Sequence, residues 1–229
     1  MELITKVIIT AMKEEADLVI KRFNLKETKS FHTFKIFEWT RENEWTDEKI
    51  VLALAWIWKI QAAITTTYIF ENYLVDKLIN VWIAWNVWWD DYKVWDVFIP
   101  NTFIQHDMYL PFDWEHLDYA KKAIFIESAT DLNYDLTKFW LIMNWVCVTW
   151  DQFVDDEEKV KKLREDFSAD ICEMEAFAVL SVAREYNSLD KCIVIKAISD
   201  WANNEAIDVH MNNLEFAMEN SINVLELVL

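Results

Sequence analysis

Along the chain, short stretches of uninterrupted apolar residues alternate with longer stretches in which apolar residues recur at helical spacing. The β-branched segment Cys192–Ile198 shows little alternation of apolar and polar positions, so it predicts a central strand buried on both faces. Phe34–Phe37 and Ile50–Leu54 predict a hairpin-linked pair of strands around the polar segment Thr40–Lys49. Further strands are predicted at Lys6–Thr10, Lys77–Val81, Val97–Ile99 and Val146–Thr149.

Helices are predicted where apolar residues recur at the spacing of helical turns. They cover Lys13–Arg22, Lys59–Tyr73, Asp155–Phe167, Glu173–Tyr186 and Asn212–Leu229. Strands alternating with helices favour an α/β fold, in which a twisted, mostly parallel mixed sheet is flanked by helices on both faces. Because the chain shows no linker and no internal repeat, we expect one domain over residues 1–229.

Carboxylates stand at the ends of these buried elements. Ser199 and Asp200 follow the strand Cys192–Ile198, and ligands of open α/β sheets bind at the carboxyl ends of strands. Glu173 and Glu175 flank Met174 at the start of a predicted helix. Taken singly, Asp200 is typical of a helix N-cap, and the two glutamates are typical of acids in a first helical turn. Taken together, they form a candidate site.

The same residues carry a resemblance to a known family. Glu-Met-Glu-Ala at 173–176, followed by an apolar strand ending in Ile-Ser-Asp at 198–200, resembles the purine nucleoside phosphorylase and nucleosidase superfamily, and within it the 5′-methylthioadenosine/S-adenosylhomocysteine nucleosidases. The family patterns A-M-x-x-E, G-x-G-K, G-x-A-G, V-G-D and S/T-G-D-x-F have ordered counterparts along the chain. These are AMKEE from Ala11, AWIWK from Ala55, NVWIAW from Asn80, VWD from Val94 and TWDQF from Thr149.

One departure from the family pattern is systematic. The chain has no glycine and fourteen tryptophans, and tryptophan stands where the family has glycine at positions 56, 58, 82, 85, 95 and 150. Average usage would give roughly 16 glycines. Glycine supplies positive φ and close backbone approach, and tryptophan supplies neither. A tryptophan-rich protein with stacking indoles is one interpretation. The more economical one is that tryptophan occupies the glycine positions of a parent sequence, and our functional expectations concern that parent.

Charge and cysteine usage narrow the class of protein. The net charge of −18 disfavours nucleic acid and anionic membranes as partners. The amino terminus lacks a signal-like segment and no apolar stretch is long enough to span a bilayer, so we expect a cytoplasmic protein. Cys147, Cys172 and Cys192 are expected to be buried, reduced thiols. We expect no metal site and no cofactor, because the histidines are scattered, at His32, His106, His116 and His210.

The resemblance implies cleavage of the N-glycosidic bond of a purine nucleoside, with adenine released from 5′-methylthioadenosine or S-adenosylhomocysteine. Asp200 would protonate purine N7, Glu15 would activate the attacking water, and Glu175 would accept hydrogen bonds from the ribose hydroxyls. An acid that works at neutral pH needs a raised carboxyl pKa, which burial can produce. Further substrate-binding residues implied are Met12, Ile83, Phe153, Val154, Glu173, Met174 and Ser199.

Several alternatives stay open at this level. Ile83 stands where close relatives carry Ser or Thr, and His106-Asp107 fits a surface turn or a site loop equally well. A phosphorolytic relative would need a phosphate pocket, and Thr10–Glu15 offers an acid there instead. A nucleoside-binding homologue without turnover would have little reason to retain Glu15, Glu175 and Asp200 together. By resemblance we also expect a homodimer.

Overall fold

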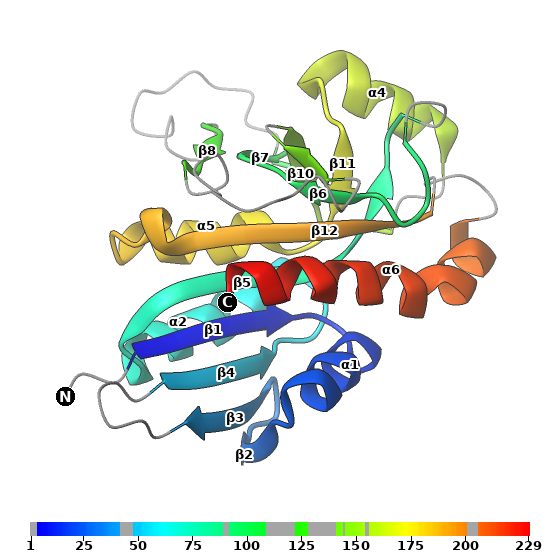
Figure 1. Ribbon diagram of the computed structural model, residues 1–229. Helices are drawn as coiled ribbons and strands as arrows, with labels where there is room; N and C mark the ends of the chain where they lie inside the picture. The colour runs from blue at the N-terminus through cyan, green and yellow to red at the C-terminus, as the bar shows by residue number, and fades with distance from the viewer. Residues whose placement is uncertain are drawn as a thin grey trace.

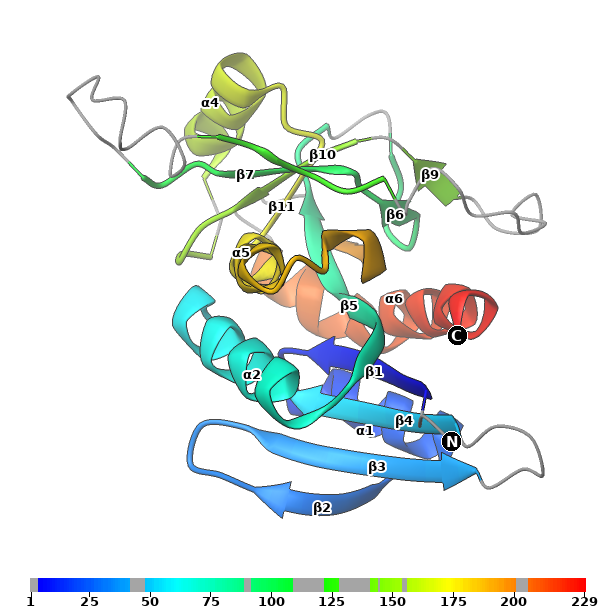
Figure 2. The same cartoon turned by 90° about the vertical axis from the view of Figure 1, so that its left-hand side faces the viewer.

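The computed structural model describes residues 4–41, 48–88, 92–108, 122–127, 141–143, 145–153, 156–200 and 206–229. Twelve strands within these residues join one sheet (Figures 1 and 2). Their bounds are β1 (Ile4–Thr10), β2 (Lys26–Ser30), β3 (Lys35–Arg41), β4 (Glu48–Leu54), β5 (Val75–Asn86), β6 (Val97–Ile99), β7 (Thr102–Gln105), β8 (Ile124–Phe125), β9 (Leu141–Met143), β10 (Val146–Thr149), β11 (Ile171–Glu173) and β12 (Cys192–Asp200).

The centre of this sheet is parallel. β5 pairs in parallel with both β1 and β12, and β1 pairs in parallel with β4, while the outer pairs β2–β3, β3–β4 and β7–β8 are antiparallel. β12 is buried from Ile193 to Ser199, which confirms the predicted central strand. The expected mostly parallel mixed sheet is therefore confirmed.

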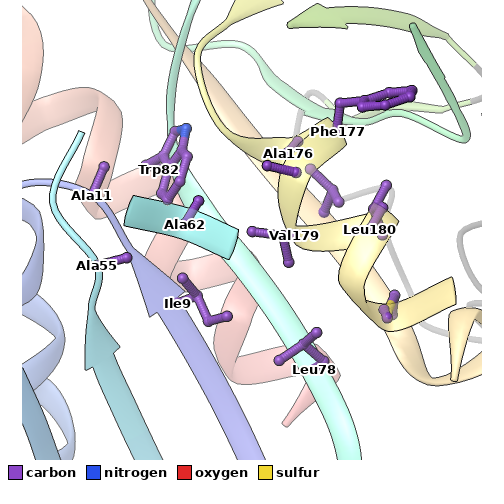
Figure 3. Close-up of a cluster of buried hydrophobic side chains, with 14 of the residues drawn as sticks. Ile9, Ala11, Ala55, Ala62, Leu78, Trp82, Ala176, Phe177, Val179 and Leu180 are labelled. Carbon is purple, nitrogen blue, oxygen red and sulfur yellow. The ribbon is translucent and has the colours of Figure 1, made fainter. Parts of the chain in front are cut away.

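Helices cover both faces of the sheet, as predicted. They are α1 (Lys13–Phe23), α2 (Lys59–Asn72), α4 (Glu157–Phe167), α5 (Ala176–Glu185) and α6 (Ala206–Val228). On one face, Ala62 of α2 and Val179 of α5 share a core with Ile9 of β1 (Figure 3). On the other face, Val19 of α1 and Ile222 of α6 pack with Ile8, the preceding residue of the same strand. Successive strand residues therefore enter two different cores, as the pleat requires.

Some boundaries differ from the predictions. Lys77–Val81 was too short, because β5 runs on to Asn86 and pairs there with β11, which joins the two halves of the sheet. The predicted helix at Glu173 begins at Ala176, since Glu173 lies in register with Thr149 as the last residue of β11. β2 escaped prediction because its sequence KETKS is exposed throughout and carries no hydrophobic signal.

Two further features bear on the sequence expectations. Cys147, Cys172 and Cys192 are free and buried, as predicted. None of the described helices combines the length and apolar composition needed to cross a membrane.

Candidate active site

A cavity of about 150 Å³ opens where β1, β5, β11 and β12 end. Eight of the ten residues predicted for the site line it: Met12, Glu15, Ile83, Phe153, Glu173, Met174, Glu175 and Ser199. The remaining lining residues are Ala11, Ile57, Trp82, Ala84 and Trp85. Of the other two predicted residues, Asp200 is described by its backbone, which pairs with Trp85 after a bulge in β12, and Val154 lies outside the described residues.

Glu15 is held by the turn between β1 and α1. Its side chain is 1% exposed, and its Oε2 accepts hydrogen bonds from the backbone N–H groups of Met12 (2.8 Å) and Ala11 (3.2 Å). Burial raises the pKa of Glu15 to about 7, against these donors and the charge of Lys196. A carboxyl poised near neutrality is suited to act as a general base.

Glu173 has both carboxylate oxygens occupied by protein donors. Oε2 accepts from the backbone N–H groups of Glu175 (3.0 Å) and Ala176 (2.8 Å), and thereby caps the start of α5. Oε2 also accepts from Lys196 Nζ at 2.9 Å, and Oε1 accepts from the hydroxyl of Thr149. Glu173 therefore acts on the cavity by fixing the backbone around Met174 and Glu175.

Glu175 is buried at the N-cap of α5, and its Oε1 accepts from the backbone N–H of Trp58 at 3.0 Å. Burial, followed by the negative charge of Glu173, raises the pKa of Glu175 well above its ordinary value. Lys196 and the Trp58 N–H act in the opposite direction. The first turn of α5 and the loop before α2 are thus joined across the cavity.

The remaining wall is mostly apolar. Met174 and Ile83 are nearly buried, and the rings of Phe153 and Trp85 meet edge to face with centroids 4.8 Å apart. Ser199 donates from Oγ to the carbonyl of Ala84 at 3.4 Å, a bond that links β12 to β5 beside Asp200. An apolar cavity with a few convergent polar groups is the usual form of a small-molecule site.

Lys196 and Thr149 contact Glu173, and sequence reasoning assigned them no role. Lys196 is 0% exposed and sits in the middle of the apolar strand β12. The signal was present in the sequence, because a lysine inside a strand buried on both faces needs a partner for its charge. Its partners, Glu173 and Asn80, come from other strands, so sequence alone could not name them.

Three tryptophans at family glycine positions have backbone dihedral angles that are unfavourable for a bulky residue. Trp56, Trp58 and Trp95 have φ of 60, 96 and 81°. Such values favour glycine, and for a bulky residue they are genuine outliers. Trp82 and Trp85 project into the cavity lining. This agrees with the interpretation that the parent sequence has glycine at these positions.

His106-Asp107 belongs to a network beside the cavity. Asp107 accepts from Lys59 Nζ with both oxygens, at 2.7 and 2.6 Å, and from the backbone N–H of Asp151 at 3.2 Å. Asp151 in turn accepts from the backbone N–H of Lys59. Burial lowers the pKa of His106 to about 4, so its ring is neutral at pH 7. The network ties the start of α2 to the loop that carries Phe153, which favours the site-loop interpretation.

A model of the Phosphorylase superfamily matches residues 5–229, so the chain belongs to that superfamily. Among curated relatives, it is similar to the 5′-methylthioadenosine/S-adenosylhomocysteine nucleosidases of Bacillus subtilis (29% identical, covering 97% of this chain and 95% of the relative) and Tolumonas auensis (27%, covering 93% and 94%). It is also similar to the aminodeoxyfutalosine nucleosidase of Helicobacter pylori (28%, covering 87% and 86%).

The chain is also similar to solved structures of nucleosidases. The 5′-methylthioadenosine/S-adenosylhomocysteine nucleosidase of Helicobacter pylori matches with a TM-score of 0.85 at 25% identity, covering 100% of this chain and 99% of that one. The enzyme of Neisseria meningitidis, in complex with methylthio-immucillin-A, matches with a TM-score of 0.83 at 26% identity over 98% of both chains. The resemblance stated from sequence motifs is therefore confirmed at the level of the superfamily and fold.

Proposed function

We propose that the chain is an N-glycosyl hydrolase that cleaves 5′-methylthioadenosine and S-adenosylhomocysteine and releases adenine. The observation that carries this proposal is the cavity itself. It is lined by the carboxylates of Glu15, Glu173 and Glu175 at the carboxyl edge of the sheet, in a chain whose named relatives are nucleosidases of this kind.

The proposed reaction breaks the C1′–N9 bond and forms a C1′–O bond to water. Glu15 takes the proton of the attacking water, and Asp200 delivers a proton to purine N7 so that adenine leaves as a neutral base. Glu175 accepts hydrogen bonds from the ribose hydroxyls while positive charge develops on the sugar. General acid and general base each contribute typically 10² to 10⁴ in rate.

The apolar wall would hold the rest of the substrate. Phe153 stacks on the adenine, the backbone of Val154 bonds its edge, and Met174 packs on the ribose. Met12 and Ile83 flank the attacking water and sugar, and Ser199 orients Asp200. Glu173 acts through the residues it caps, because its oxygens already accept from protein donors.

Charge favours water over phosphate as the nucleophile. The described lining of the cavity contains three glutamates and neither lysine nor arginine. Carboxylates at such short range would repel a phosphate dianion by several kcal/mol at the low effective dielectric of a closed site. The phosphorolytic alternative lacks a comparable supporting feature in this cavity.

An assay with competing nucleosides tests the proposal. The protein would be made in two forms: the chain as written, and a glycine form with glycine at all fourteen tryptophan positions. 5′-Methylthioadenosine, S-adenosylhomocysteine, adenosine, inosine and 6-amino-6-deoxyfutalosine would be supplied with and without phosphate. We expect the glycine form to release adenine from the 5′-thioadenosines at a rate indifferent to phosphate. A ribose 1-phosphate product, or preference for the futalosine derivative, would contradict the assignment.

We further propose that the protein is cytoplasmic, that each subunit is a single domain and that two subunits form a homodimer. The three buried, free cysteines fit a reducing compartment, and the acidic chain fits a protein that keeps away from nucleic acid and anionic lipid. The single sheet shared by the described strands supports one domain. Exposed apolar side chains on α2, Ile60 and Ile64, support a second subunit on that helix.

A further inference from the structure

Lys196 is the buried centre of a network that joins the strands below the cavity. Its Nζ donates to Oε2 of Glu173 and to Oδ1 of Asn80, both at 2.9 Å. The amide of Asn80 in turn donates to the carbonyl of Ile9 in β1, at 3.4 Å. Through these contacts β12, β5, β11 and β1 are tied together, and β1 leads directly into the turn that holds Glu15.

The charges around this lysine are unbalanced. Lys196 forms an ion pair with Glu173 of β11. Its charge also acts on Glu15 of α1, on Glu175 at the start of α5 and on Cys147 of β10. Lys196 is the cation common to all of these interactions. Its charge lowers the pKa of Glu15 and of Glu175, both of which burial raises. One ammonium therefore counters several buried acids.

We propose that Lys196 is a positioning residue of the hydrolytic reaction: it holds Glu173 in place to present Glu175, it ties β12 and β5 to β1 through Asn80, and its buried charge favours the ionised form of the base Glu15. This inference rests on the proposed function and adds to it a residue outside the cavity lining. Lys196 touches no reacting atom. It acts through the charge that Glu15 feels and through the cap that Glu173 provides to α5.

The sign of the expected effect follows from the charges. Glu15 must be ionised to accept a proton from water, so kcat/KM rises with pH through its pKa. Removing the cation at position 196 makes ionisation harder and moves this acidic limb to higher pH. A lysine that only stabilised the fold would, on removal, lower kcat/KM by the same factor at every pH.

The test uses the glycine form and compares Lys196→Met, Lys196→Arg and the exposed control Lys161→Met. We expect Lys196→Met to move the acidic limb of kcat/KM up by about one pH unit, hence a loss of roughly tenfold on the acidic side that is recovered at alkaline pH. In Lys196→Arg and Lys161→Met, the acidic limb of kcat/KM should lie at the same pH as in the parent. An unmoved limb in Lys196→Met would overturn the proposal.

Two safeguards keep the result interpretable. If Lys196→Met fails to fold because Glu173 is left as a buried, unpaired charge, the double variant Glu173→Gln/Lys196→Met removes both charges and should show the same upward shift. Carbon-13 NMR titration of labelled glutamate, with Glu15 assigned from Glu15→Gln, follows the same ionisation without turnover. If the parent is inactive but the titration of Glu15 still shifts in Lys196→Met, only the proposed function is rejected. An unshifted titration would reject the role of Lys196.

The backbone at the tryptophans carries a second, independent inference. Six described residues have positive φ; Asn24, Ser168 and Asn187 lie just beyond helices, whereas the other three are all tryptophan. Positive φ is unfavourable for a bulky residue, because its Cβ approaches the backbone too closely. Within the described part of the chain, the buried indole N–H groups of Trp85 and Trp150 also have no hydrogen-bond partner, which is unfavourable for a buried donor.

These penalties concern one residue type in a chain that contains no glycine at all. We infer that glycine occupies the fourteen tryptophan positions in the protein as its source cell makes it. The cause would be a codon that this cell reads as glycine and that the sequence above gives as tryptophan. UGA is the candidate codon, since variant genetic codes read this ordinary stop codon as an amino acid. Glycine at positions 82 and 85 would also remove two indoles from the cavity wall.

Codons and mass test this inference directly. We expect UGA at all fourteen positions in the gene. The intact protein from the source cell should be lighter than the chain with fourteen tryptophans, because each indolylmethyl group is replaced by a hydrogen atom. Its absorbance at 280 nm should come from tyrosine alone. UGG codons at positions 56, 58 and 95, or tryptophan-containing peptides covering them, would overturn the inference.

Discussion

Glu15, Glu173 and Glu175 are chemically identical side chains that their surroundings make different. Both carboxylate oxygens of Glu173 are occupied by hydroxyl, ammonium and backbone donors of the protein. Glu175 accepts one backbone N–H and is pushed towards protonation by burial and by Glu173. Glu15 lies between these cases, with its pKa near 7. Distinct environments for neighbouring carboxyl groups can separate their roles, and the pKa of Glu15 near 7 supports its proposed role as the base.

Substitution of Glu15 by Gln should have opposite effects on catalysis and on stability. Turnover should be lost at every pH, because the amide cannot take a proton from water. Stability should change in the opposite sense. The folded pKa of about 7 exceeds the ordinary 4.5, so the folded state loses stability as pH rises from 4.5 through 7. Above pH 7, Glu15→Gln should therefore be more stable than the parent by on the order of 3 kcal/mol.

Thermal unfolding at pH 5 and pH 8 measures this effect, with the exposed neighbour Glu14→Gln as the matched control. The Tm difference between Glu15→Gln and the parent should be near zero at pH 5 and clearly positive at pH 8, while Glu14→Gln stays level with the parent. A Tm difference that is the same at both pH values would show that Glu15 is not held with a raised pKa.

The sequence pointed to these acids and, by resemblance, to different roles for Glu15 and Glu175, but it did not predict the contacts that make their environments different. The pattern Glu-Met-Glu-Ala and the strand ending at Asp200 placed the carboxylates at one edge of the sheet. What distinguishes them comes from Trp58, Thr149 and Lys196, which lie far away along the chain. Hydrogen-bond partners of this kind are fixed by strand order and register, and neither can be read from the spacing of apolar residues.

At the scale of elements, the site is built where loops of both halves of the sheet are tied together. Lys59 opens α2, Asp107 follows β7, and Asp151 follows β10 and precedes Phe153. Burial works against the ionised form of Asp107, but the hydrogen bond and charge of Lys59 prevail and hold its pKa below the ordinary range. The ion pair therefore stays intact at pH 7 and fixes the loop whose ring is proposed to stack on adenine.

Asp107→Asn tests this connection. The change weakens the pair with Lys59 without touching the proposed acid or base. We expect KM for 5′-methylthioadenosine to rise several-fold with kcat nearly unchanged, because stacking on Phe153 contributes alike to the ground state and the transition state. Steady-state kinetics of the glycine form measure both constants, with exposed Asp166→Asn as the control. A large fall in kcat with unchanged KM would place Asp107 in the chemical step instead.

At the scale of the whole molecule, the sequence predicted the parallel centre better than the edges. Central strands such as β12 are buried on both faces, so their apolar segments stand out. Edge strands are short or exposed, as β2 shows, and their pairing depends on neighbours that sequence patterns do not identify. The predicted strand Lys77–Val81 stopped inside the motif NVWIAW, whereas β5 continues through this motif to Asn86.

The outer face of α2 is where the proposed homodimer can be tested. Ile60 and Ile64 lie one helical turn apart and are 68% and 44% exposed. Apolar side chains that cluster on an exposed helix surface indicate an interface. The glycine form should sediment as a dimer at micromolar concentration. Ile60→Glu/Ile64→Glu should sediment as a monomer, because a buried interface cannot take up two unpaired carboxylates.

Leu74→Glu is the matched control, since Leu74 is 64% exposed beyond the other end of the same helix. It should remain dimeric if the interface lies on the first turns of α2. Sedimentation velocity distinguishes the species, and circular dichroism checks that each variant keeps its helices. A parent that sediments as a monomer would contradict the homodimer. A double variant that stays dimeric would move the interface to another face, because no dimer packed on Ile60 and Ile64 tolerates charge at both positions.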